Sequence, residues 1–222
     1  MYIDLYSLSL WTGIVPGVLF CASGNSDFQT ITFKTTDDGL IQGSLFEADK
    51  KLCVVFAHGM VFNKESWYPV AEHFRKAGIS SLSIDFRGYG NSRAGTTKDL
   101  LYDIPGATDF LTKNNFEDIA LAGGSMGAAA ITRALAHFPD LPVSKIILLA
   151  PAGGDPVKST HIQKLFVVSA EDGFHSTVES LYASSNEPKT LKIYPGSSHA
   201  QHMFKTDFKN DLLQLMVHFL KK

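Results

Sequence analysis

Residues 120–130 constrain the fold of this chain more than any other segment. A short apolar run is followed by Gly-x-Ser-x-Gly at residues 123–127, and then by small residues that open a helical pattern. This order predicts a strand that ends in a sharp turn, with Ser125 at its tip. Gly123 and Gly127 lack side chains that would clash where strand and helix nearly touch, and Ser125 is expected to adopt strained dihedral angles. The turn therefore predicts a hydroxyl exposed at the carboxyl edge of a sheet.

The rest of the chain alternates strand-like and helix-like segments. Two expected strands, residues 29–34 and 40–46, flank an Asp-Gly turn and predict an antiparallel hairpin. Continuous apolar runs such as residues 52–57 are typical of strands covered on both faces. Further strands are expected at residues 79–85, 119–122, 145–150, 164–169 and 191–194, and helices at residues 66–77, 100–112 (interrupted by Pro105 and Gly106), 128–137 and 208–220. This order predicts an α/β fold with a mostly parallel central sheet and helices on both faces.

The connection after the expected strand at residues 145–150 is short. Residues 151–163 form only a loop that contains Pro and Gly, so there is no room for a helical lid domain. We therefore expect the carboxyl edge of the sheet, and any site on it, to be open.

Length and composition are those of one large domain. The chain has 222 residues, of which 45% are hydrophobic, and 20 basic against 22 acidic residues give a net charge of −2. Because the basic residues form no patch or stripe, we expect no nucleic-acid partner. Two cysteines, without clustered Cys or His spacing, predict no metal site. Oligomeric state is not predicted by any of these features.

The N-terminal segment, residues 1–26, has two interpretations. Its apolar centre, residues 8–22, is too short for a stable membrane span and has the length of a secretory signal peptide. Asp4 and the absence of Lys and Arg before this centre count against export. A secreted or periplasmic protein is expected if the segment is a signal peptide, and a cytoplasmic protein with a disordered tail if it is not. In both cases residues 27–222 are predicted to form the α/β domain.

A serine nucleophile needs a general base and a carboxylate that orients the base, and both have candidates downstream. Glu171 and Asp172 follow one expected strand, and His199 follows the next. Parallel sheets place their ligands at the carboxyl ends of such strands. Because adjacent residues point in different directions, only one of the two acids is expected to face the base. His202 and His175 compete with His199 for the role of base.

Five motifs, taken in their order along the chain, resemble the α/β-hydrolase family over roughly residues 27–222. The motifs are His58-Gly59-Met60, Asp-x-Arg-Gly-x-Gly-x-Ser at residues 85–92, the turn at residues 123–127, Asp172 and His199. Compact, lidless carboxylesterases, acylglycerol lipases and serine-aminopeptidase-like hydrolases are most similar in appearance.

The resemblance implies a catalytic triad of Ser125, Asp172 and His199. It also implies an oxyanion hole, formed by the backbone N–H groups of Met60 and Met126, and no cofactor. His199 would take the proton of Ser125 as its oxygen attacks an ester carbonyl, and Asp172 would hold the imidazole in place.

Trp67 and His58 are candidates for the substrate pocket. A helix that packs on the sheet explains Trp67 equally well, and a structural hydrogen-bonding role explains His58.

The predicted function is that of a serine hydrolase that cleaves carboxylic esters of short to medium acyl chains, with a small-molecule ester as its partner. A peptidase, amidase or thioesterase with the same triad is the alternative, because the triad does not select the substrate. A non-catalytic binding module and a mutase or lyase of the same fold are the remaining interpretations.

Overall fold

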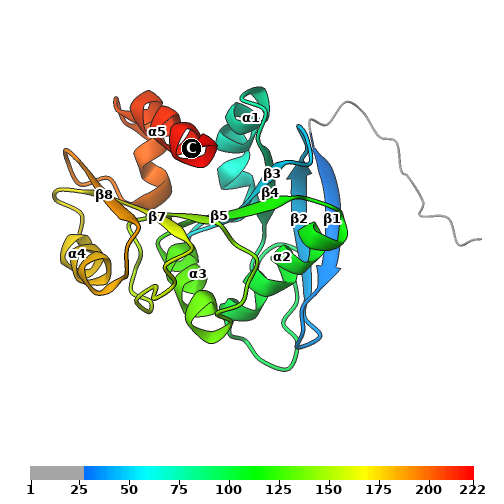
Figure 1. Ribbon diagram of the computed structural model, residues 1–222. Coiled ribbons are helices and arrows are strands. Elements are labelled where there is room, and N and C mark those ends of the chain that lie inside the picture. Colours follow the sequence, from blue (N-terminus) through cyan, green and yellow to red (C-terminus); the bar gives the residue numbers. More distant parts are fainter. Residues whose placement is uncertain (1–27) are drawn as a thin grey trace, which may run out of the picture.

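The protein is built around one eight-stranded sheet (Figure 1). The structure is a computed structural model, and it describes residues 28–222. The order of strands across the sheet is β1-β2-β4-β3-β5-β6-β7-β8. Their bounds are β1 Gln29–Lys34, β2 Leu40–Phe46, β3 Leu52–Ala57, β4 Ser80–Ile84, β5 Asp118–Gly124, β6 Lys145–Leu149, β7 Gln163–Ser169 and β8 Lys189–Tyr194.

The first two strands form the predicted hairpin. β1 and β2 are antiparallel, with Gln29 opposite Leu45, and β2 is also antiparallel to β4. Asp38 in the turn adopts a φ of 65°, a conformation that Asp tolerates better than most residues. All other neighbouring strands are parallel, from β4 through β3 to β8. The prediction of a mostly parallel sheet with an N-terminal antiparallel hairpin is therefore confirmed.

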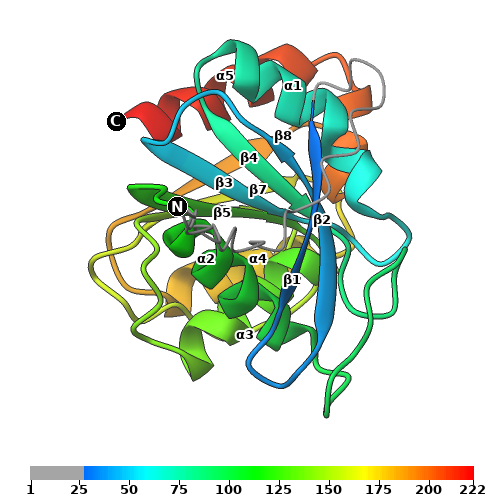
Figure 2. The same cartoon turned by 90° about the vertical axis from the view of Figure 1, so that its right-hand side faces the viewer.

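Helices cover both faces of the sheet (Figures 1 and 2). One face carries α1 and α5, and the opposite face carries α2, α3 and α4. Their bounds are α1 Tyr68–Lys76, α2 Asp103–Lys113, α3 Met126–His137, α4 His175–Ser184 and α5 Lys209–Lys221, with short 3-10 helices η1 Lys64–Trp67, η2 Leu100–Tyr102 and η3 Ala200–Lys205. Because both faces are covered, strands such as β3 and β4 are buried over most of their length.

Two local features differ from the sequence-based expectation. Helix α4 was not predicted, because its apolar residues are few and only Val178 and Leu181 are buried. Helix α2 is not interrupted by its proline, because Pro105 lies in the first turn, where its missing N–H breaks no helical hydrogen bond. Gly106 follows it at a close contact, since a Cβ there would lie 2.9 Å from Cγ2 of Thr35.

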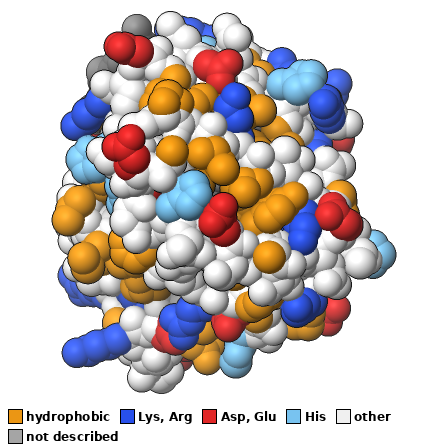
Figure 3. All heavy atoms as spheres, turned by 90° about the vertical axis from the view of Figure 1, so that its left-hand side faces the viewer, with side chains coloured by type: hydrophobic (Ala, Val, Ile, Leu, Met, Phe, Trp, Pro, Cys, Tyr) orange, Lys and Arg blue, Asp and Glu red, His pale blue; other side chains and the backbone are white. Residues whose placement is uncertain are grey.

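The chain passes from β6 to β7 through a loop without a helix, as predicted. The carboxyl edge of the sheet is therefore not covered by a lid inserted at this point. Over residues 28–222, no helix combines the length and the apolar character needed to cross a membrane. On the face beside α4 and β8, acidic and basic side chains are intermixed with hydrophobic ones (Figure 3). The predicted N-terminal segment, residues 1–26, lies outside the described residues.

Candidate active site

Ser125 occupies the sharp turn between β5 and α3. Its φ of 53° and ψ of −113° are strained for a residue with a Cβ atom, as predicted from the sequence. Glycines stand two residues before and two residues after Ser125, because the backbone of the turn passes very close to the backbones of α3 and β3. A Cβ on Gly123 would lie 2.6 Å from the backbone nitrogen of Ala128, and a Cβ on Gly127 would collide with the carbonyl oxygen of Ala57. The turn is held by hydrogen bonds from Ser125 N–H to the carbonyl of Leu149 and from Ala129 N–H to the carbonyl of Ser125.

Asp172 and His199 form a hydrogen-bonded pair at the ends of β7 and β8. The Nδ1 atom of His199 lies 2.8 Å from Oδ2 of Asp172. The side chain of Asp172 is almost fully buried, and its other oxygen accepts a hydrogen bond from the N–H of Phe174. A buried carboxylate fixed on both oxygens holds the imidazole in one orientation and tautomer.

The other candidates for these two positions have different contacts. Glu171 is exposed to solvent, whereas Asp172 is buried. His175 lies 3.0 Å from the carbonyl oxygen of Ser169 and 3.3 Å from the carboxylate of Glu179. His202 is exposed and packs its ring against Phe62. The geometry therefore favours Asp172 over Glu171, and His199 over both other histidines.

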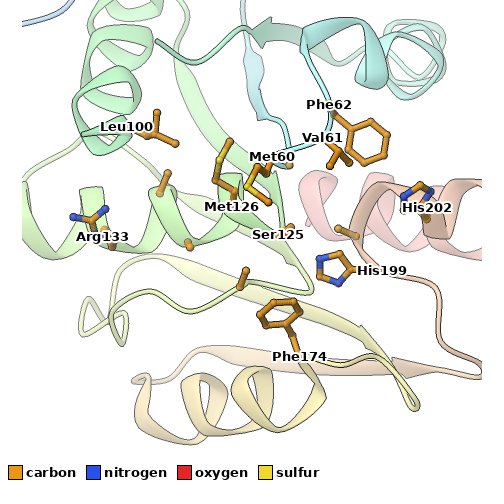
Figure 4. A pocket seen from close by; sticks show the side chains of 15 residues that line it. Met60, Val61, Phe62, Leu100, Ser125, Met126, Arg133, Phe174, His199 and His202 are labelled. Atoms are coloured by element: carbon orange, nitrogen blue, oxygen red, sulfur yellow. The ribbon is translucent and has the colours of Figure 1, made fainter. Parts of the chain in front are cut away.

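Ser125 and His199 line the same cavity, which has a volume of about 490 Å³ (Figure 4). The residues that line the cavity are mostly apolar. Two of these residues, Met60 and Met126, have the backbone N–H groups that are predicted to form the oxyanion hole. No hydrogen bond joins Ser125 to His199 in the part of the chain that the structure describes. Such bonds are often long before a substrate is present and shorten only in the reacting complex.

The N–H groups of Met60 and Met126 are free to bind a ligand. Met126 is the first residue of α3, where helical N–H groups have no acceptor within the helix. Met60 follows Gly59 in the loop after β3. Across residues 28–222, neither N–H donates to a protein acceptor. Both residues line the cavity beside Ser125, so their unpaired N–H groups are the candidates for an oxyanion hole.

The structure places both candidates for the substrate pocket outside the cavity wall. Trp67 is fully buried, stacks on Phe56 at a ring distance of 4.7 Å, and does not line the cavity. It belongs to the core because η1 packs onto the sheet. His58 is also fully buried and outside the cavity wall. Its Nδ1 lies 2.8 Å from the Gly59 carbonyl oxygen, and its Nε2 accepts from the N–H of Phe86.

Burial explains the structural role of His58. Loss of solvation lowers the pKa of its imidazole from the usual value, so the ring is neutral near pH 7. A neutral imidazole with one protonated nitrogen can donate to Gly59 and accept from Phe86 at the same time. His58 thereby ties the loop after β3 to the segment after β4.

Charged residues of the Asp-x-Arg-Gly motif anchor neighbouring loops. Asp85 is buried and accepts hydrogen bonds from both the backbone N–H and the ammonium group of Lys64, at 2.8 and 2.6 Å. Arg87 pairs with Asp37 and Asp103, each at 2.7 Å. Hydrogen bonding from the Arg87 guanidinium holds the pKa of Asp37 well below its usual range. These buried pairs satisfy one another and do not reach the cavity.

Gln201 is a buried residue near the site for which the sequence predicted no role. Its Oε1 accepts a hydrogen bond from the N–H of Gly59 at 3.0 Å, and its Nε2 donates to Oγ of Ser66 at 2.8 Å. A Cβ on Gly124 would lie 2.6 Å from the same Oε1. Gln201 thus joins the loop of His199, the loop of Met60 and the turn of Ser125. Its place two residues after His199 was the only signal in the sequence.

No three His, Cys, Asp or Glu side chains form a group suited to a metal ion within residues 28–222.

The fold and the geometry of this site together define an α/β hydrolase. Residues 48–202 match the family model of the serine aminopeptidases, S33. The chain belongs to this family of α/β hydrolases.

Relatives and solved structures agree with this assignment. A hydrolase of Acinetobacter baylyi that acts on (E)-2-((N-methylformamido)methylene)succinate is 33% identical over 97 residues, which cover 43% of this chain and 36% of that relative. The AB hydrolase superfamily protein YisY of Bacillus subtilis is 31% identical over 102 residues, or 45% of this chain and 37% of the relative. The match thus spans little more than a third of each relative. The esterase Pf2001 of Pyrococcus furiosus shares the fold, with a TM-score of 0.72, 17% identity, and coverage of 90% of this chain and 95% of that chain.

Proposed function

We propose that this chain is a serine esterase that hydrolyses carboxylic esters of short to medium acyl chains through an acyl-enzyme. The observation that carries the proposal is the hydrogen bond between Asp172 and His199, because His199 lines the same cavity as the strained Ser125. A hydroxyl at the tip of such a turn, a base held by a buried carboxylate and an open apolar cavity are the parts that acyl transfer needs.

Each residue of the proposed triad has one task. The Nε2 atom of His199 accepts the proton of Ser125 as Oγ attacks the ester carbonyl carbon. Asp172 stabilises the imidazolium that results, and its own orientation is maintained by the N–H of Phe174. His199 then gives the proton to the leaving alcohol oxygen, and the C–O bond breaks to leave an acyl-Ser125. A water molecule, activated by the same histidine, hydrolyses this intermediate.

The N–H groups of Met60 and Met126 are proposed to bind the oxyanion of the tetrahedral intermediate. A preorganised donor of this kind typically contributes about 3 kcal/mol to the stability of the transition state. Because Met126 is the first residue of α3, the positive end of the helix dipole adds to the attraction.

The cavity supports an ester substrate better than a peptide with a free N-terminus. An aminopeptidase must bind the ammonium group of its substrate, for which a carboxylate is the strongest partner. Among the described residues, no Asp or Glu lines the cavity, whereas Arg133 does. An ammonium group in the cavity would therefore have no carboxylate partner on the cavity wall, because the carboxylate nearest to Arg133, that of Asp99, is already paired with the guanidinium.

Labelling with a fluorophosphonate and turnover of p-nitrophenyl acetate, butyrate and octanoate test the proposal. We expect Ser125 to displace fluoride from the probe, and all three esters to be hydrolysed. Leucine p-nitroanilide, which carries a free ammonium group, should be hydrolysed at least about 10-fold more slowly than N-acetylleucine p-nitroanilide, which has the same scissile bond without the charge, because the ammonium group lacks a partner in the cavity. A protein that takes up no label and cleaves no ester would disprove the proposal.

Replacement of Gln201 by methionine is expected to lower both stability and turnover. The N–H of Gly59 would lose its acceptor in a buried place, which costs about 1–3 kcal/mol of the free energy of unfolding. Since Gly59 precedes Met60, the oxyanion donor would also lose its fixed position, so kcat should fall more than KM changes. Urea denaturation and ester kinetics measure the two effects. The exposed Gln214→Met on α5 is the matched control and should change stability by no more than about 0.5 kcal/mol. Equal behaviour of the two variants would contradict this role of Gln201.

A further inference from the structure

The cavity extends away from Ser125 along one face of α3. Four residues of this helix line the cavity, and their spacing places them on the same side of the helix: Met126, Ala129, Ala130 and Arg133. Since a helix rises about 1.5 Å per residue, this face runs roughly 10 Å from Met126 to Arg133. The two alanines leave space between the larger side chains at either end. We call the part of the cavity lined by these four residues and Leu100 the acyl groove (Figure 4).

His199 determines which part of an ester lies in the acyl groove. In the proposed reaction His199 protonates the leaving oxygen, so the leaving alcohol must lie on the His199 side of Ser125. In Figure 4, His199 and His202 lie on one side of Ser125, and Leu100 and Arg133 lie on the other. The acyl chain therefore extends along α3 toward Arg133.

Arg133 places a fixed cation at the far end of this groove. Its two terminal nitrogens bind the carboxylate of Asp99 at 3.0 and 2.6 Å, and Asp99 is itself held by the N–H of Leu101. This paired geometry fixes the plane of the guanidinium. Of the five N–H groups of an arginine, two bind Asp99, which leaves three for a ligand. The Arg133 side chain is 43% exposed, so a ligand in the groove can reach it.

From this geometry we infer that the acyl groove binds a medium-length, unbranched acyl chain whose far end carries a carboxylate, and that Arg133 binds this carboxylate. The inference rests on the proposed esterase function, since it assigns a substrate class to the same site. The apolar middle of the groove suits the methylene chain, and the guanidinium suits a carboxylate, for which its flat array of donors is well shaped. The preferred substrates are then monoesters of dicarboxylic acids, in which one carboxyl group is esterified and the other is free, rather than esters of fatty acids.

Two esters of equal chain length test the inference. They are p-nitrophenyl octanoate and the mono-p-nitrophenyl ester of octanedioic acid, which differ only in the terminal carboxylate. We expect kcat/KM to be about 10-fold higher for the carboxylate-ended ester, a modest ratio because Arg133 is partly exposed and already paired. Arg133→Met should bring this ratio close to one, and because both esters are measured on the same variant, any general change in activity cancels in the ratio. Lys113→Met is the matched control, because it removes the same charge from an exposed ion pair with Asp109 on α2, and it should keep the ratio.

Ala129→Leu tests whether the chain lies in the groove at all. The larger side chain should fill the space beside α3 and lower kcat/KM for both eight-carbon esters at least about 10-fold relative to that for the acetate ester, measured on the same variant. The inference is overturned if acetate is hydrolysed but the wild type does not distinguish the two eight-carbon esters, or if Arg133→Met keeps the ratio. It is also overturned if only a carboxylate on the alcohol part, as in 4-acetoxybenzoate, raises kcat/KM in an Arg133-dependent way. Absence of both labelling and acetate hydrolysis would instead remove the proposed function and the inference with it.

Discussion

Ser125→Ala is expected to reduce kcat for p-nitrophenyl esters by about 10⁵- to 10⁶-fold. The proposed reaction begins with attack by Oγ, and loss of a nucleophile in a triad removes most of the catalysis that the triad provides as a unit. Labelling by the fluorophosphonate should disappear completely, because it requires the same oxygen. Initial rates and in-gel fluorescence measure these effects. Unchanged activity of the variant would rule out Ser125 as the nucleophile.

Ser125→Gly separates loss of chemistry from loss of structure. The residue has a φ of 53°, which costs a side-chain-bearing residue about 1–3 kcal/mol. Glycine relieves this strain but loses about 0.5–1 kcal/mol more conformational entropy on folding than alanine does. The glycine variant should therefore be inactive and yet about 1 kcal/mol more stable than the alanine variant, as measured by urea denaturation. Lower stability of the glycine variant would mean that the turn is not strained.

Asp172→Asn is expected to reduce kcat by about 10⁴-fold with little change in stability. The asparagine can still accept the hydrogen bond from the N–H of Phe174, so the loop after β7 should stay in place. It lacks the negative charge that stabilises the imidazolium, and its NH₂ group favours the wrong tautomer of His199. Steady-state kinetics with p-nitrophenyl butyrate and urea denaturation together measure the two properties.

Glu171→Gln is the control for this prediction. Glu171 has the same charge and is the adjacent residue, but it is exposed, whereas Asp172 is buried against His199. We expect its removal to change kcat less than about twofold, since a screened surface charge contributes little. A large loss in Glu171→Gln, with Asp172→Asn active, would assign the role of the acid to the other residue.

The order of the strands and helices was predictable because it depends on local patterns. The hairpin at β1 and β2, the buried run of β3 and the turn around Ser125 each follow from residue types within a few positions. Helix α4 was not predicted, because a prediction from local patterns fails where the local pattern is weak. Its sequence buries only Val178 and Leu181, so the helical pattern of apolar residues is too weak to stand out.

The pocket was predicted less well than the proposed triad. Trp67 and His58 have side chains that suit a binding site, but both are fully buried outside the cavity. Their position depends on how η1 and the loop after β3 pack on the sheet, which no local pattern records. Gln201 was missed because its partners, Gly59 and Ser66, are more than 130 residues away in sequence.

The amino-acid sequence by itself determined the α/β architecture, the strained turn at Ser125 and the short set of acids and histidines at strand ends. These features follow from hydrophobic periodicity and from the steric demands of glycine-rich turns, which act over a few residues. Only the tertiary structure decided that Asp172 rather than Glu171 faces His199, and that Arg133 lines the same cavity as Ser125. Side-chain direction and burial depend on contacts between segments far apart in the chain, so they exist only once the sheet has formed and the helices have packed on it.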